Sequence, residues 1–125
     1  MGLFDKWLKS KSGDSKPPDH AVFVYFKLSD DDMGDGEIDD AIYSMEEDLR
    51  RLIETSGSGE FDGDEWGGGL CQLFIYGPDA DRLFEVIQPE LLKAHGLPLT
   101  RIIKRYGGPG AQQTEMQWAE GKQTS

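Results

Sequence analysis

The chain of 125 residues carries 24 acidic residues against 13 lysines and arginines, a net charge of −11 at pH 7. Its length fits one domain with a modest core, and 37% hydrophobic and 10% aromatic residues exclude an intrinsically disordered chain. We expect a cytoplasmic protein, because no apolar run is long enough for a membrane span, the N-terminus lacks a secretory signal, and the single cysteine excludes an internal disulfide.

The first segment is polar apart from its start. Leu3, Phe4, Trp7 and Leu8 can share one helical face. We therefore expect residues 1–19 to form an amphipathic segment and a flexible linker, residues 20–119 a single domain, and residues 120–125 a disordered tail. The amphipathic segment either docks on the domain, frays, or associates with a membrane surface.

The next two elements have clear periodicities. Residues 21–28 predict a central strand, because apolar side chains occupy both of its faces. From Glu37 the apolar residues recur at steps of three and four, which predicts a helix that stops at the Ser-Gly repeat of residues 56–59.

The second half of the chain alternates strands and a helix. Residues 60–69 predict a short, irregular strand around Phe61–Trp66, and residues 70–76 predict a regular one. Asp79 is a candidate N-cap for a second helix, with a kink or break expected at Pro89. Residues 99–106 predict a last strong strand, and the stretch around residues 114–118 an additional edge strand.

This order predicts an α+β fold of the ferredoxin-like βαββαβ type. We expect an antiparallel sheet with two helices on one face and an extra C-terminal edge strand.

The negative charge is concentrated in one segment. Residues 30–65 hold fifteen acids against two arginines, a charge of −13, whereas the rest of the chain carries +2. One interpretation is a solvated face that keeps the protein in solution. The other, which we prefer, is a docking surface for a basic protein such as a nuclease or toxin. Nucleic acid is not expected as a partner, because phosphate contacts need a basic footprint.

The acidic-docking hypothesis names candidate partner-binding residues in two clusters and one aromatic neighbour. They are Asp30, Asp31, Asp32, Asp35, Glu37, Asp39, Asp40, Asp62, Asp64, Glu65 and Trp66.

No motif predicts a catalytic residue, a metal site or a cofactor. The stretch 31–39 resembles an EF-hand loop only in part, because Met33 and Ile42 stand where ligands are needed. Gly67–Gly69 precedes a strand, whereas phosphate-binding loops open a helix. Cys71 lies in an apolar strand and is expected to be core.

Two alternatives to the docking hypothesis stay open. One is a small enzyme or small-ligand-binding protein that uses the Asp62–Gly69 loop with Tyr76 or Tyr106 nearby. The other is pairing through the sheet, which would make the protein a weak homodimer instead of a monomer.

The segments FDGDEWGGG, FIYGPDADRLFEVIQPEL and RYGGPGA resemble a pattern of small uncharacterised bacterial cytoplasmic proteins over residues 60–111. In size, acidity and inferred topology the chain is also similar to the protein regulator of ribonuclease E and to toxin-immunity proteins. These resemblances imply an acidic regulator or inhibitor and transfer no individual residue.

Overall fold

The computed structural model describes residues 19–28, 36–93, 97–119 and 122–124, with the side chains of residues 36 and 37 outside that description. Within these ranges the elements follow the order β1, α2, β2, β3, α3, β4, β5 and β6. The protein is therefore of the α+β class.

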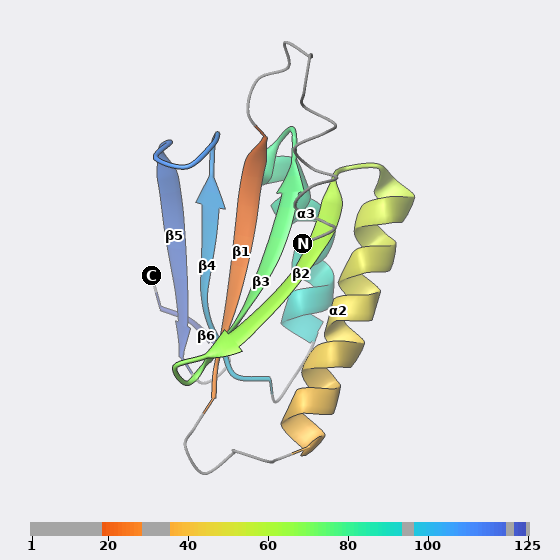
Figure 1. The fold of residues 1–125 in the computed structure, drawn as a ribbon, viewed down its shortest axis with the longest axis vertical. Coiled ribbons are helices and arrows are strands. Elements are labelled where there is room, and N and C mark those ends of the chain that lie inside the picture. The colour runs from red at the N-terminus through yellow and green to blue at the C-terminus, as the bar shows by residue number, and fades with distance from the viewer. Residues whose placement is uncertain (1–18, 29–35, 94–96, 120–121, 125) are drawn as a thin grey trace.

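The strands form one open antiparallel sheet (Figure 1). They are β1 (His20–Lys27), β2 (Glu60–Gly67), β3 (Leu70–Gly77), β4 (Leu99–Arg105), β5 (Gln113–Ala119) and β6 (Lys122–Gln123), in the spatial order β2-β3-β1-β4-β5-β6. Because β1 lies between β3 and β4, the prediction of a central strand is confirmed. The expected additional strand after β4 is present as β5, but it is not the edge of the sheet, because the short β6 pairs with its outer side.

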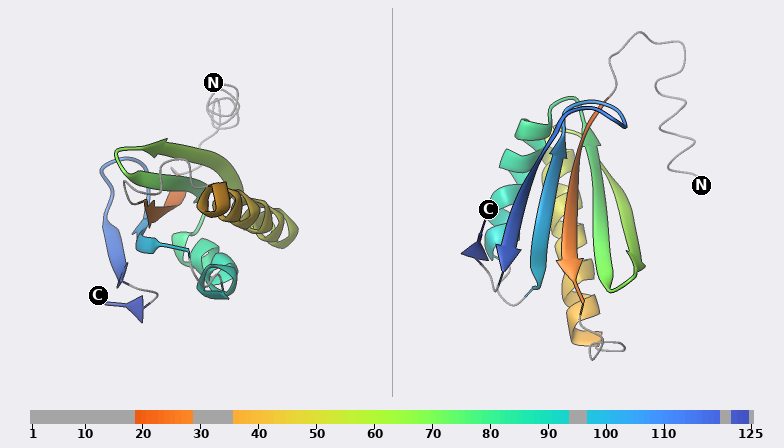
Figure 2. Two further views of the ribbon diagram at one scale, coloured as in Figure 1. Left: turned by 90° about the horizontal axis from the view of Figure 1, so that it is seen from below. Right: turned by 90° about the vertical axis from the view of Figure 1, so that its left-hand side faces the viewer.

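Helices α2 (Gly36–Ser56) and α3 (Ala80–Lys93) cover the same face of the sheet (Figure 2). Between them and the sheet lies the main core. Its largest fully buried side chains come from both helices and from β1, β3 and β4: Val22, Val24, Phe26, Ile42, Leu49, Ile53, Cys71, Leu73, Ile75, Leu83, Ile87 and Ile102.

Helix α2 follows its apolar periodicity closely. Ile42, Met45, Leu49 and Ile53 are all buried, at spacings of three and four residues that place them on one helical face. After Ser56 the chain turns at Gly57, where φ is 67°. The backbone N–H of Gly57 donates to the carbonyl of Glu54, and that of Ser58 to the carbonyl of Ile53. This pair of bonds is the Schellman ending that glycine favours.

Helix α3 is capped as the sequence predicts and is not broken by its proline. The Asp79 Oδ1 atom accepts hydrogen bonds from the backbone N–H groups of Asp81 and Arg82, at 3.0 and 3.2 Å. The helix runs continuously through Pro89, so the expected break does not occur. Pro89 and Glu85, whose carbonyl loses its helical partner, are both exposed, and water can replace the missing bond there.

The opposite face of the sheet carries a second, smaller apolar cluster. Ala21, Phe23 and Ile103 are its buried members, with Phe74 and Tyr76 packed at its side. The Arg105 guanidinium lies 5.2 Å from the centre of the Phe23 ring, and that of Arg101 lies 4.2 Å from the centre of the Tyr25 ring. The arginine stems therefore cover part of this face.

The two helices and the antiparallel sheet are consistent with an arrangement of the ferredoxin-like type. Neither helix in the described ranges has the length and apolar character that crossing a membrane requires.

Candidate functional site

Helix α2 runs alongside β2, the strand at one edge of the sheet (Figure 1). Asp39, Tyr43 and Glu46 recur at steps of four and three, so they form one stripe along the helix. This stripe lies beside the core positions of the helix and faces the edge of β2. We call the contact between the stripe and β2 the α2–β2 seam.

A β-bulge decides which side chains β2 contributes to the seam. The register of β2 against β3 shifts between Phe61 and Gly63, so that Phe61, Asp64 and Trp66 pair with Ile75, Leu73 and Cys71. These three partners all belong to the core under the helices. Without the bulge, alternation from Phe61 would turn Gly63 and Glu65 toward α2 instead.

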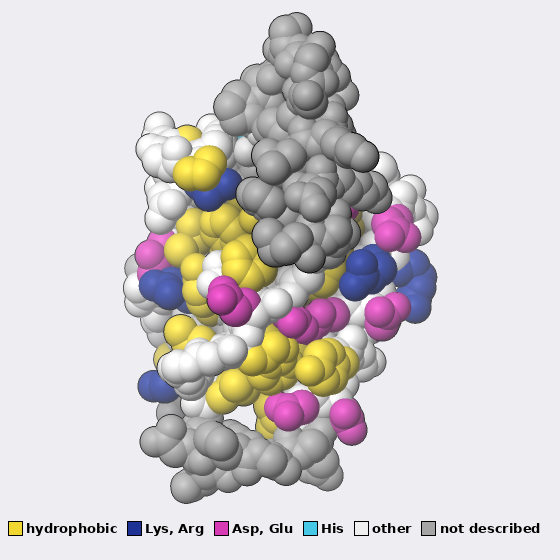
Figure 3. Space-filling model, viewed as in Figure 1, with side chains coloured by type: hydrophobic (Ala, Val, Ile, Leu, Met, Phe, Trp, Pro, Cys, Tyr) yellow, Lys and Arg dark blue, Asp and Glu magenta, His cyan; other side chains and the backbone are white. Residues whose placement is uncertain are grey.

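Two aromatic rings meet across the seam. The ring centres of Tyr43 and Trp66 are 5.5 Å apart, with an angle of 44° between their planes. Tyr43 nevertheless remains 51% exposed. Figure 3 shows hydrophobic side chains at the surface over this part of α2 and β2, with Asp and Glu side chains on either side of them.

Glu46 places a carboxyl group inside this seam. The side chain is only 7% exposed, and its Oε2 atom is buried without a hydrogen-bond partner among the described residues. Burial, a hydrogen bond with the Asp64 carboxyl and the negative charge of Asp64 together raise the pKa of Glu46 to about 8. Glu46 therefore keeps its proton at neutral pH.

Trp66 and Cys71 complete the seam beneath the carboxyl groups. The Trp66 Nε1 atom is also buried without a described hydrogen-bond partner. Burial and the charges of Asp64, Glu46 and Asp39 raise the pKa of Cys71 to about 12. The thiol is thus un-ionised at neutral pH and is a poor nucleophile, as expected for a core cysteine.

The same charges act on Tyr43. Desolvation, followed by the charges of Asp64, Asp39 and Glu46, raises the pKa of its hydroxyl above the usual value of 10.0. One tyrosine hydroxyl and three carboxyl groups therefore share the seam.

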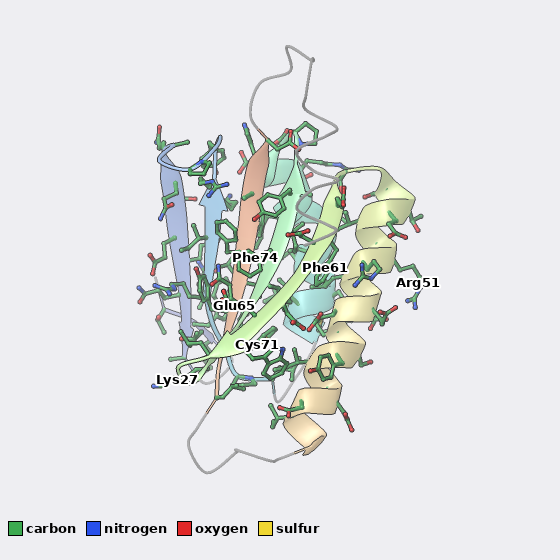
Figure 4. The ribbon with its side chains drawn as sticks, viewed as in Figure 1. Lys27, Arg51, Phe61, Glu65, Cys71 and Phe74 are labelled. Atoms are coloured by element: carbon green, nitrogen blue, oxygen red, sulfur yellow. The ribbon has the colours of Figure 1, made fainter. Side chains whose placement is uncertain are left out.

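Basic residues leave these acids largely uncompensated. Arg50 and Arg51 form ion pairs with Glu47 and Asp48 on α2 itself, and the Arg51 side chain points away from the sheet (Figure 4). On β4, Arg101 pairs with Glu115 and Lys104 with Asp81. Within the described ranges, no lysine or arginine forms an ion pair with any of the five acids Asp39, Asp40, Asp62, Asp64 and Glu65.

The sequence-predicted residues divide into three groups. Asp39, Asp64 and Trp66 come together at the seam, with Asp40 exposed beside them on α2. Asp62 and Glu65 lie on the other face of β2. Asp30, Asp31, Asp32 and Asp35, together with the side chain of Glu37, lie outside the described residues.

Sequence reasoning missed Tyr43 and Glu46. The sequence indicates them only by their position: Tyr43 comes directly after the core residue Ile42, and Glu46 directly after Met45. Such places border the buried face of an amphipathic helix, where a polar side chain can be drawn into the contact with a neighbouring strand.

A shallow hollow of about 340 Å³ lies on the open face of the sheet. It is lined by Asp62, Gly63, Asp64, Glu65, Phe74 and Tyr76, and Figure 4 shows Glu65 and Phe74 on the face turned toward the viewer. Burial raises the pKa of Asp62 above its usual value. In the described part of the chain, no group of three His, Cys, Asp or Glu side chains is arranged to hold a metal ion.

The fold and the seam define a small α+β domain with an acidic, aromatic surface site. Comparisons with protein-family models, with curated proteins and with solved structures find no match to the chain.

Proposed function

We propose that this protein is a non-enzymatic, acidic protein-binding domain that docks a basic protein partner, as a regulator or a nuclease- or toxin-directed inhibitor does. The observation that supports this most directly is the α2–β2 seam, where a half-exposed tyrosine packs against a tryptophan among acids that form no ion pair with the described lysines and arginines. Tyrosine and tryptophan are the residues most enriched at binding hot spots.

The charge distribution fits a basic partner. Acidic groups on one side of a protein raise the rate of encounter with a positive surface and reject negative ones. A merely solvated acidic face has no need of a half-exposed tyrosine packed against a tryptophan. Tyr43 therefore favours docking over simple solubility.

The docking function is tested by capture on the immobilised full chain. We expect wild type to retain a defined basic protein from bacterial lysate at low salt and to release it at about 0.3 M NaCl. A double variant, Asp39→Asn with Asp64→Asn, should retain at least tenfold less of it.

The matched control removes the same charge elsewhere. In Glu54→Gln with Glu85→Gln, both acids are exposed and lie outside the seam, so capture should stay close to wild type. Equal losses in both double variants would show that diffuse charge, not the seam, causes binding. Failure to retain any basic protein at low salt would contradict the docking function itself.

Two finer statements belong to this proposal. We propose that the unit from β1 to β4 is ferredoxin-like, which is supported by the strand order β2-β3-β1-β4. We also propose a cytoplasmic location, supported by a single cysteine that is buried in the core.

The hollow on the open sheet face favours a second candidate, a small-ligand-binding protein or enzyme. Asp62, Glu65 and two aromatic residues line the same depression, and burial raises the pKa of the Asp62 carboxyl group. A metabolite library screened by NMR tests it, because a ligand at this site must shift the Phe74 and Tyr76 resonances.

A further inference from the structure

Two buried polar atoms of the α2–β2 seam have no partner among the described residues. One is a carboxyl oxygen, Glu46 Oε2, and the other is a hydrogen-bond donor, the indole Nε1 of Trp66. Most buried polar groups are hydrogen-bonded, because leaving one unpaired forfeits its interaction with water. A group that supplies both missing partners would therefore bind here more favourably than at the rest of the surface.

We propose, on the basis of the docking function above, that the seam receives an arginine side chain of the partner protein. Its guanidinium donates hydrogen bonds to the carboxyl groups of Glu46 and Asp64 and lies against the rings of Tyr43 and Trp66. A backbone carbonyl beside that arginine accepts a hydrogen bond from Trp66 Nε1. A peptide segment offers both groups at once, which a free ion does not.

The chemistry of the seam favours arginine over lysine. A guanidinium is planar, donates through several N–H groups in a fixed geometry and stacks on aromatic rings, whereas an ammonium is a compact, strongly hydrated charge. Two carboxyl groups and two rings match the first description. One helical turn further along the seam, the Arg50 guanidinium of the protein itself lies 5.0 Å from the centre of the Phe61 ring.

Tyr43 controls access to Glu46. The Glu46 Oε2 atom is buried in the free protein, whereas Tyr43 is half exposed and packs against Trp66. Rotation of the Tyr43 side chain thus opens the seam while leaving the core in place. In the rotated position the Tyr43 ring lies against the bound guanidinium.

Arginine binding should release a proton from the seam. Glu46 is protonated at neutral pH, and a guanidinium beside it favours the ionised form. The titratable and charged groups that face Glu46 are Asp64 from β2, Cys71 from β3, and Tyr43, Glu47 and Arg50 from α2. The pKa of Cys71 is about 12 and that of Tyr43 lies above 10.0, so both keep their protons near neutral pH. Glu46, with a pKa of about 8, is therefore the group that loses the proton.

The test uses Nα-acetyl-arginine methylamide as the probe and the full chain labelled with ¹⁵N. The readout is the indole N–H resonance of Trp66, assigned with Trp66→Phe. We expect a saturable shift with the arginine probe and none with its neutral citrulline counterpart. The Kd should be about five- to tenfold lower at pH 7.5 than at pH 6.5, because the ionised carboxyl becomes more abundant.

Two variants and one control distinguish a direct role of the seam in arginine binding from a merely structural role. Glu46→Gln keeps the shape of the protonated side chain and should weaken the arginine probe at least tenfold. Tyr43→Ala changes an exposed position and should also weaken it, with an unchanged far-ultraviolet CD spectrum. Glu54→Gln, an exposed acid near the end of the same helix, should leave the Kd unchanged.

Three outcomes would overturn the proposal that the seam binds an arginine side chain. They are no shift with the arginine probe up to its solubility limit, equal shifts with the citrulline probe, and an unchanged Kd in Glu46→Gln. A lysine probe that binds as tightly overturns the choice of arginine. If Glu46→Gln still captures the basic partner with wild-type affinity, the docking function is retained and only the proposal of arginine binding at the seam is wrong.

Discussion

Glu46 holds its carboxyl group in a buried position, where glutamate is rarely found unless it is paired. Its neighbours Ile42, Met45 and Leu49 on α2 are in the core, and the glutamate itself is only 7% exposed. Ionising such a group costs free energy, because the charge loses water and approaches the carboxylate of Asp64. The raised pKa of Glu46 is the direct consequence.

The raised pKa predicts that stability falls as pH increases through neutrality. Folded Glu46 keeps its proton up to about pH 8, whereas the unfolded side chain loses it near 4.5. Between those values the folded state binds more protons, so its free energy of unfolding decreases with pH, by on the order of 5 kcal/mol in total and about 3 kcal/mol of that between pH 5.5 and pH 8.5. Urea unfolding from about pH 5.5 to pH 8.5 measures this decrease.

In Glu46→Gln the decrease should be nearly absent, because the amide does not ionise. Glu54→Gln serves as the control, since its carboxyl is exposed and removing it should leave the wild-type slope. A wild-type stability that is flat or rises over this range would contradict the inferred burial of Glu46.

At the scale of elements, β2, β3 and α3 approach one another closely at one point. A Cβ atom added at Gly59 would collide with the carbonyl oxygen of Tyr76 and with the Leu83 side chain, and one added at Gly77 with the carbonyl oxygen of Ser58. These glycines allow the start of β2 and the end of β3 to lie against α3. They therefore help to hold the edge strand that carries the seam.

Alanine at Gly59 should consequently destabilise the protein by about 1–3 kcal/mol, because backbone has to move to admit one methyl group. Gly67, at the other end of β2, is the matched control: a Cβ atom there meets nothing within 4 Å, and its φ is not positive. Gly67→Ala should leave the stability unchanged or slightly higher. Chemical unfolding measures the free energy of unfolding of both variants. Equal stability of Gly59→Ala and Gly67→Ala would contradict the close approach of the backbone at Gly59.

At the scale of the whole molecule, the negative charge gathers where α2 and β2 lie together. The two elements follow one another in the sequence, and their acids meet because α2 packs along the sheet edge (Figure 1). The bases on β4 pair with acids elsewhere, so they do not offset this charge. Repulsion among the acids therefore opposes folding, and salt weakens it.

We accordingly expect the free energy of unfolding to increase by about 1 kcal/mol between roughly 0.02 and 0.3 M NaCl. In Asp39→Asn with Asp40→Asn the increase should be smaller, since two of the crowded charges are gone. Urea unfolding at each salt concentration gives the comparison. A wild-type stability that does not respond to NaCl would mean that the acids are too far apart to repel one another.

The sequence by itself determined the elements and their ends. Local rules suffice for these: the apolar spacing of α2, the glycine at position 57 and the Asp79 cap act within a few residues. The two apolar faces of β1 likewise predicted its central place. The continuous helix through Pro89 escaped these rules, because tolerance of a proline depends on which side of the helix faces water.

Only the tertiary structure decided the candidate site. Asp64 and Trp66 face α2 because of a bulge between Phe61 and Gly63, and a strict two-residue alternation would have turned them away. Glu46 then meets Asp64 across 18 positions of sequence, and its burial and raised pKa follow from that meeting. Charge is visible in a sequence, but the distance between charges and their exclusion from water arise only when elements pack.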